Sequence, residues 1–266
     1  MPTLESLPVE LLYEIFIFAL NETLPCCSRH VYSVFKYAPL SVQAEYVVLQ
    51  SLPTDDLASK VLRFPICTLP VLKTILRNPS YAALLSKHSR TKVKLPRWLF
   101  QSLAPSPRPR VVGMKKQRPK EPWSSEDAPI PLLRFLLEEP RIPNPDWNHR
   151  DGYPLAKAVT AGFIPLVRFL LENGASPACK GGLAVRVAIN KKDLGLVKML
   201  IEPDGSVKDA DGRKVRRRRI EDRVKVSPEM LKVAVKVDAR DIVQYFIKEK
   251  GCVPNMQTVL MMTSGL

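Results

Sequence analysis

A nine-residue pattern that occurs five times constrains the fold of this chain more than any other feature. The copies are LPVLKTILR (69–77), IPLLRFLLE (130–138), IPLVRFLLE (164–172), LGLVKMLIE (194–202) and RDIVQYFIK (240–248). Each copy has apolar residues at its third, fourth, seventh and eighth positions, the spacing of one helical face. The copies start 61, 34, 30 and 46 residues apart. A period near ~33 residues with insertions predicts a solenoid of helix pairs.

The stretch 151–177 contains the most complete pair. A first helix is expected to begin at Pro154, and Gly162 should break it before the second helix at 164–172. Asn173-Gly174 then supplies a left-handed stop. A pair of this size cannot bury its own apolar stripe, so it needs neighbours of the same kind.

First helices of further pairs are expected at 95–103, 183–193 and 227–239. Two of these align with the first helix of 151–177 through small residues, so that Ala188 and Ala234 match Ala158. Small side chains at one position of successive helices allow close packing between pairs.

Residues 4–20, LESLPVELLYEIFIFAL, predict an amphipathic helix of another kind. This helix is apolar on nearly all sides after Glu14, so something beyond its own short domain should enclose it. Helical segments are also expected at 28–38 and 41–52.

The segment Leu7-Pro8-x-Glu10-Leu11-Leu12-x-x-Ile15-Phe16 resembles the opening signature of the F-box family, a three-helix module that here covers 3–50. The next segment, LPCCSRHVYSVF, resembles its second helix, with Tyr32 or Phe35 in place of the family's tryptophan. The resemblance implies docking on the Skp-type adaptor of a cullin–RING ubiquitin ligase. The residues implied in this contact are Leu7, Pro8, Leu11, Leu12, Ile15 and Phe16. A core helix that happens to begin Leu-Pro is the alternative.

The repeats resemble the ankyrin family. Tyr153-Pro154-Leu155 stands where that family has Thr-Pro-Leu, and Leu170-Leu171-x-x-Gly174-Ala175 matches its LLxxGA. Ala156 replaces the family's usual histidine, and the glycine at Gly162 becomes Lys192 and then Lys236 or a nearby residue. The expected fold class is therefore all-α: a small N-terminal three-helix F-box-like domain followed by a degenerate ankyrin-like helical-pair solenoid.

Four regions are predicted on this basis. They are the F-box-like domain (3–50), a degenerate helical repeat region (55–103), a basic, proline-rich loop (104–129), and the ankyrin-like repeats (130–266) with a basic insertion at 203–226.

The net charge of +15 is concentrated in two segments: residues 105–120 carry +6 and residues 208–225 carry +5. The run Arg216, Arg217, Arg218 and Arg219 fits a nuclear-import patch, a contact with nucleic acid or an acidic partner, or a solvated loop. Lys115-Lys116-Gln117-Arg118 fits an import signal equally well. Specific nucleic-acid binding is not expected, because the insertion lacks aromatic residues for base stacking and a reading helix.

Stacked helix pairs present their turns and the outer faces of their first helices along one edge, where a protein substrate would bind. The excess of Lys and Arg at this edge favours an acidic partner. The candidate residues are Asp151, Tyr153, Lys157, Lys180, Arg186, Asn190 and Lys191.

No catalytic or metal-binding constellation occurs, so neither enzymatic activity nor a cofactor is expected. The five cysteines lack CxxC spacing and are interpreted as buried free thiols, with palmitoylation of Cys26-Cys27 as the alternative. No signal peptide or spanning segment is apparent, which favours the cytoplasm or nucleus and no membrane partner.

Two functions follow. In the first, the chain is a substrate-recognition adaptor of an SCF-type cullin–RING ubiquitin ligase, with the F-box on the Skp-type adaptor and the repeats on a protein substrate. In the second, the chain is a non-catalytic ankyrin-type scaffold or nuclear regulator whose residues 3–50 form a hydrophobic cap.

Overall fold

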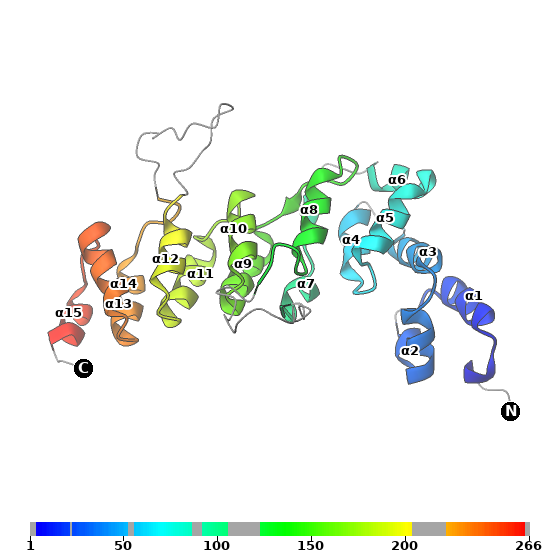
Figure 1. Ribbon diagram of the computed structural model, residues 1–266, viewed down its shortest axis with the longest axis horizontal. Coiled ribbons are helices and arrows are strands. Elements are labelled where there is room, and N and C mark those ends of the chain that lie inside the picture. Colours follow the sequence, from blue (N-terminus) through cyan, green and yellow to red (C-terminus); the bar gives the residue numbers. More distant parts are fainter. Residues whose placement is uncertain are drawn as a thin grey trace, which may run out of the picture. The chain divides into compact units, whose positions relative to one another are not determined.

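The computed structural model describes residues 4–21, 23–52, 56–86, 92–105, 123–203 and 222–263. They divide into two compact units. Unit 1 comprises the chain up to Ser102 together with Glu126–Asp146, and unit 2 comprises Leu103–Ser125 and the chain from Trp147 onward. Within the described residues the structure is mostly helical, with one short pair of strands (Figure 1), which confirms the predicted all-α class. The finer domain boundaries stay predictions.

Unit 1 begins with the three helices expected from the sequence. A 3-10 turn, η1 (Leu4–Ser6), leads into α1 (Val9–Ala19), which starts directly after Pro8. Another 3-10 turn, η2 (Leu24–Cys26), precedes α2 (Arg29–Lys36), and α3 (Leu40–Ser51) follows.

Aromatic rings join these helices. The ring centroids of Phe16 and Phe35 lie 4.5 Å apart, and those of Phe35 and Tyr46 lie 4.7 Å apart. The Tyr46 hydroxyl donates to the backbone oxygen of Asn21 at 3.1 Å. One aromatic side chain from each helix therefore forms the centre of this part of unit 1.

The carbonyl groups at the end of α2 receive their hydrogen bonds from a buried side chain of α3. The amide nitrogen Nε2 of Gln43 lies 3.4, 3.1 and 3.0 Å from the backbone oxygens of Phe35, Lys36 and Ala38. Helix-terminal carbonyls have no partner within their own helix, so a buried helix end needs such a donor.

The remaining elements of unit 1 are α4 (Leu57–Arg63), α5 (Leu69–Arg77), α6 (Pro79–Ser86), α7 (Trp98–Gln101) and α8 (Ile130–Glu138). Helix α3 packs on α4 and α5. The strands β1 (Val93–Lys94) and β2 (Pro145–Asp146) pair in parallel, a two-residue element that the sequence did not predict.

Unit 2 is built of successive helix pairs. They are α9 (His149–Ala161) with α10 (Ile164–Glu172), α11 (Cys179–Asn190) with α12 (Leu194–Ile201), and α13 (Pro228–Lys236) with α14 (Arg240–Gln244). A π-helical turn, η3 (Tyr245–Glu249), extends α14, and α15 (Met256–Thr263) follows. The first helices stack on one another in the order α9, α11, α13 (Figure 1).

The nine-residue pattern predicted these second helices well. Helices α5, α8 and α10 cover the predicted residues, and α12 ends one residue earlier. The fifth copy is α14 together with η3. The repeated spacing of apolar residues therefore reflects a repeated helix.

The aligned alanines are buried at the same position of each first helix. Ala158, Ala188 and Ala234 each have an exposed fraction of 0%. Their backbone oxygens accept hydrogen bonds from the backbone nitrogens of Phe163, Asp193 and Ala239, at 3.0, 3.3 and 3.0 Å. Each of these nitrogens belongs to the residue just before a second helix, so the same bond sets the turn in all three pairs.

In each pair, the residue just before the donor of this hydrogen bond has a left-handed backbone. It is Gly162 with φ 71°, Lys192 with φ 56° and Asp238 with φ 48°. In the third pair the position equivalent to Gly162 is therefore Asp238, two residues beyond the Lys236 named from the sequence. Left-handed backbone favours glycine because other residues have a Cβ that crowds the following carbonyl oxygen.

Substituting Gln43→Ala should destabilise unit 1 by about 1–3 kcal/mol, because the backbone oxygens of Lys36 and Ala38 lose their side-chain donor. The midpoint of urea unfolding, followed by circular dichroism, measures this loss. Gln50→Ala, at a half-buried position of the same helix, is the matched control and should shift the midpoint far less.

Substituting Lys192→Gly should stabilise unit 2 by about 0.5–1 kcal/mol, because it removes the cost of a left-handed Cβ. Lys192→Ala removes the same charge but keeps the Cβ, so it should give no gain. Equal thermal midpoints for Lys192→Gly and Lys192→Ala would contradict a backbone origin of the effect.

Candidate functional site

Helix α1 has two apolar faces. On one face, Leu12 and Phe16 are each 1% exposed and belong to the core of unit 1. Of the six residues implied in adaptor binding, these two are unavailable to a partner in this conformation. Of the other four, Leu7 and Ile15 are half-buried, whereas Pro8 and Leu11 are exposed.

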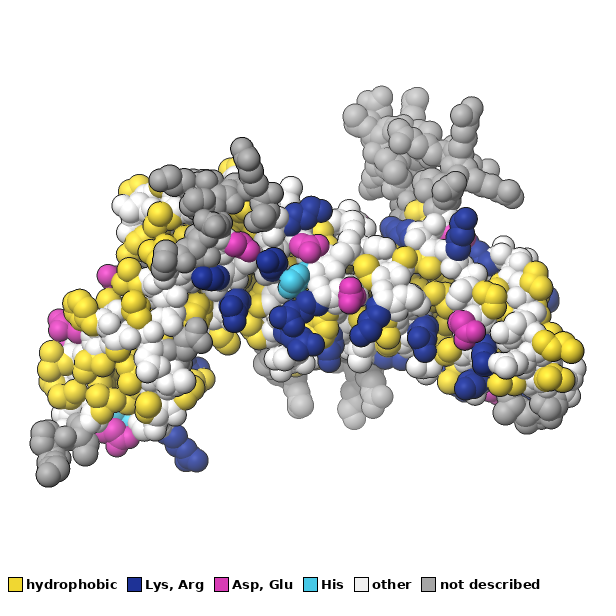
Figure 2. Space-filling model, turned by 180° about the vertical axis from the view of Figure 1, so that it is seen from behind, with side chains coloured by type: hydrophobic (Ala, Val, Ile, Leu, Met, Phe, Trp, Pro, Cys, Tyr) yellow, Lys and Arg dark blue, Asp and Glu magenta, His cyan; other side chains and the backbone are white. Residues whose placement is uncertain are grey.

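The second face carries Leu11, Ile15 and Phe18, spaced at i, i+4 and i+7, so that they lie in one row on the helix. The exposed fractions of Leu11 and Phe18 are 44% and 83%. We call these three residues the outer stripe of α1. Hydrophobic side chains (yellow) gather over this N-terminal part of unit 1 at the lower left of Figure 2.

Sequence reasoning missed Phe18 as a member of this stripe, although the same helical spacing from Leu11 would have found it. The structure also distinguishes the two aromatic residues of α2 that the sequence offered, Phe35 and Tyr32. Phe35 is 6% exposed and lies in the core, whereas Tyr32 is 53% exposed. Phe35 therefore fills the position of a core aromatic residue in α2.

In unit 2, the turns before the first helices have an unusual backbone. Arg150, Asp151 and Gly152 are consecutive left-handed residues, with φ of 55°, 58° and 74°. The next repeat has the same three-residue turn at 180–182. Regular helix starts only after each turn, close to the predicted start at Pro154. Left-handed non-glycine residues are costly, so surrounding contacts must hold them in place.

Asn148 supplies such contacts between two successive turns. Its Oδ1 accepts a hydrogen bond from the Ser176 backbone nitrogen at 2.7 Å, and its Nδ2 donates to the Gly174 oxygen at 3.4 Å. A Cβ added at Gly152 would lie 2.7 Å from the Cβ of Cys179, so the two turns also pack closely. Residues 148–152 are thereby fixed against the next repeat.

The candidate substrate-binding residues lie on these turns and on the outer faces of α9 and α11. Aligning α9 with α11 through Ala158 and Ala188 places the candidates in two adjacent rows of the first helices. One row holds Tyr153 and Lys157 of α9, and the other holds Arg186 and Asn190 of α11. The Lys157 ammonium lies 5.9 Å from the centroid of the Tyr153 ring. Asp151, Lys180, Arg186 and Asn190 are exposed.

Lys191 differs from the other candidates because its ammonium group is already engaged. Its Nζ donates to the backbone oxygen of Thr160 at 2.5 Å, near the C-terminal end of α9. A cation at this position is favoured by the helix dipole. The structure therefore gives Lys191 a role in joining two repeats.

The ends of the basic insertion are held together by Lys250. Its Nζ lies 3.0 Å from Oε1 of Glu202 and 2.8 Å from Oδ1 of Asp222, residues on either side of 204–221, the part of the insertion outside the described residues. The Arg223 backbone nitrogen also donates to the Ile201 oxygen at 2.8 Å. The insertion thus leaves and rejoins unit 2 at one place. Arg216–Arg219 and Lys115–Arg118 lie outside the described residues.

Glu202 is the most strongly bonded carboxylate of this cluster. Burial opposes its ionisation, but hydrogen bonds from Lys250 and the Tyr245 hydroxyl outweigh burial and hold the pKa of Glu202 below its usual value. For Tyr245, burial raises the pKa, and the bond to Glu202 raises it further. The arrangement is that of a structural ion-pair cluster.

The cysteines only partly match the interpretation as buried thiols. Cys67 and Cys252 are buried, and burial raises the pKa of the Cys67 thiol to about 12. Cys26 and Cys27 are exposed, so the prediction of burial was wrong for this pair. They lie in and beside the short turn η2.

Among the described residues, no group of His, Cys, Asp and Glu side chains has the geometry of a metal site. None of the helices in these ranges combines the length and apolar character needed to cross a bilayer. Comparisons with family models, with curated proteins and with solved structures gave no match.

Substituting Lys250→Met should lower the stability of unit 2 at pH 7 by about 1 kcal/mol, because Glu202 and Asp222 lose their shared cation. The folded protein favours the charged form of Glu202, so this stabilisation is present above its usual pKa near 4.5 and is lost as the pH falls and the carboxyl is protonated.

Thermal unfolding at pH 7 and at about pH 3 measures this effect, since the wild type and Lys250→Met should differ at the first pH and converge at the second. Lys248→Met, an exposed lysine nearby, is the control for loss of a charge. An undiminished difference at the lower pH would show that Lys250 acts through packing.

Proposed function

We propose that this chain is a non-catalytic adaptor that docks through α1 onto the Skp-type adaptor of a cullin–RING ubiquitin ligase and holds a protein substrate on its helix-pair repeats. The F-box and ankyrin resemblances of the sequence motivate this proposal, and its place of action is the cytoplasm or the nucleus. No cofactor is required, because the ubiquitin chemistry takes place on other subunits.

The exposed outer stripe of α1 is the observation that carries the proposal. Phe18 and Leu11 remain 83% and 44% exposed even though Leu12 and Phe16 of the same helix are buried. Exposed apolar surface of this kind is characteristic of protein-interaction sites. The docking contact is therefore assigned to Leu7, Pro8, Leu11 and Ile15 with Phe18, and Leu12 and Phe16 support it from within.

The repeats have a surface of a different character. The outer faces of α9, α11 and α13 carry Lys157, Arg186, Lys232 and Lys236, and the preceding turns add Arg150 and Lys180. Glu229 and Asp151 are the acidic residues among them. An acidic protein segment fits this surface best, since complementary charge speeds association and excludes basic partners.

One observation favours the second candidate function, a scaffold whose first fifty residues form a cap. Helix α3 packs on α4 and α5, and its Val47 and Val48 are 0% exposed. Removing residues 1–52 would uncover α4 and α5 whichever function is correct. Deletion therefore does not separate the two functions, whereas exposed point substitutions do.

The double substitution Leu11→Asp/Phe18→Asp should abolish capture of the purified Skp-type adaptor without unfolding the protein, because both side chains are exposed. A pull-down measures the captured adaptor, and circular dichroism checks the fold. Val253→Asp, at a 77% exposed position of unit 2, is the control and should leave capture unchanged.

Capture of equal amounts of adaptor by wild type and the double variant would refute docking through the outer stripe. Failure of wild type itself to bind the adaptor would favour the scaffold function.

A further inference from the structure

The last helix of the described chain, α15, occupies the place of a first helix in one more repeat. It packs on α13, as α13 packs on α11 and α11 on α9. It also starts in the same way: Asn255 Oδ1 accepts a hydrogen bond from the Thr258 backbone nitrogen, just as Ser227 Oγ accepts one from Met230. This shared cap sets the register between α13 and α15.

In this register, core positions of α13 become exposed positions of α15. Leu231 and Ala234 are each 0% exposed, but their equivalents Val259 and Met262 are 39% and 36% exposed. Each earlier first helix packs on a second helix of its own pair, and α15 has none among the described residues. The face of α15 that carries Val259 and Met262 is therefore exposed in the described part of the chain.

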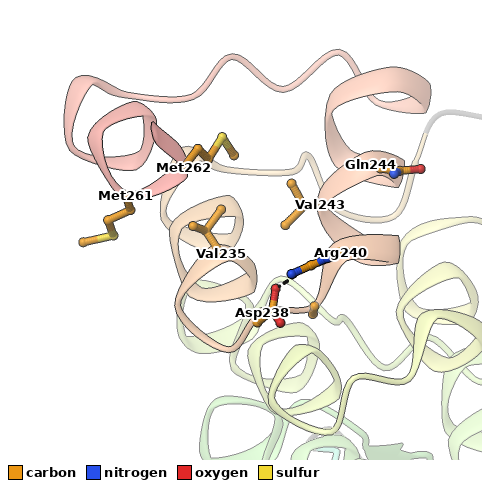
Figure 3. A pocket seen from close by; sticks show the side chains of 8 residues that line it. Val235, Asp238, Arg240, Val243, Gln244, Met261 and Met262 are labelled. Atoms are coloured by element: carbon orange, nitrogen blue, oxygen red, sulfur yellow. Dashed lines mark hydrogen bonds and ion pairs between the residues drawn. The ribbon is translucent and has the colours of Figure 1, made fainter. Parts of the chain in front are cut away.

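A groove lies beside this exposed face of α15, and Met262 belongs to both. Side chains of α13, α14 and α15 line a cavity of about 390 Å³. In Figure 3, Val235, Val243 and Met262 point toward one another across it, and the ion pair between Arg240 and Asp238 lies below them. A groove with apolar walls of this kind accepts the apolar side of an amphipathic helix.

Helix α15 also carries a ridge that such a groove would accept. Met256, Val259 and Leu260 lie at i, i+3 and i+4, and the exposed fractions of Met256 and Leu260 are 77% and 59%. Where α13 has Lys232 on its outer face, α15 has Leu260 at the equivalent position. The same helix, α15, therefore contributes both to the wall of the groove and to the ridge.

We propose that a second copy of this chain covers this surface, with the α15 ridge of each copy seated in the groove of the other. A surface that carries both complementary features is self-complementary about a two-fold axis. This self-association goes beyond the adaptor function and is independent of it.

Two further observations support a second copy as the occupant. The exposed large hydrophobic side chains of the described part of unit 2 are confined to Ile247–Met262. Hydrophobic side chains also mark this C-terminal end at the right of Figure 2. In addition, residues 251–266 contain no Lys, Arg, Asp or Glu, although the chain has a net charge of +15. Two copies therefore meet through α15 without bringing like charges on this helix together.

The test is the mass of the full-length protein in solution, measured by sedimentation equilibrium from roughly 1 to 100 µM, a range that detects moderate affinities. Wild type should form a dimer. Met256→Glu/Leu260→Glu should raise the dimer dissociation constant at least about tenfold, since it places four carboxylates in the interface. Phe18→Glu, an exposed apolar position of unit 1, should leave the dimer intact.

If the double variant loses helicity, Met256→Glu alone replaces it, because that side chain is 77% exposed. A wild-type protein that stays monomeric throughout this range overturns the proposal and leaves the groove to a helix of another protein. A dimer that persists in the variants overturns it as well, because the contact must then lie elsewhere.

Discussion

The hydrogen bond from the start of each second helix to the carbonyl of a buried alanine is the interaction on which the repeats of unit 2 depend. It closes the turn after Ala158, Ala188 and Ala234 in the same way. The small alanine side chain lets neighbouring first helices approach closely, and the bond fixes where the second helix leaves. Repetition of one backbone geometry therefore orders unit 2, and departures such as Lys192 and Asp238 are tolerated at a local cost.

The N-terminal helices of unit 1 also depend on a few specific contacts. Gln43 supplies the hydrogen bonds that the end of α2 lacks, and three aromatic rings fill the space between the helices. This core is complete with only one face of α1. The outer stripe, Leu11, Ile15 and Phe18, is not needed for this core, and the exposure of Leu11 and Phe18 is the basis of the proposed adaptor function.

The proposed binding surfaces differ in their chemistry. The outer stripe of α1 is apolar and suits a stable assembly, because burying apolar area supplies most of the free energy of association. The repeat turns and outer helix faces are polar and basic, as expected of a surface that recognises charge. Helix α15 resembles α1 in this respect, since it too exposes apolar side chains.

The sequence alone determined the helices of the nine-residue pattern, because helical spacing of apolar residues depends only on local periodicity: α5, α8 and α10 match their predicted ranges. The first helix expected at 95–103 is only the short helix α7 (Trp98–Gln101). The sequence also placed the aligned alanines in register. Only the tertiary structure decided which apolar face is covered. Elements distant in the chain bury Leu12 but not Leu11, and Ala234 but not Met262. The periodicity of the sequence cannot specify such contacts. Engagement of Lys191 by Thr160 likewise depends on how two repeats pack.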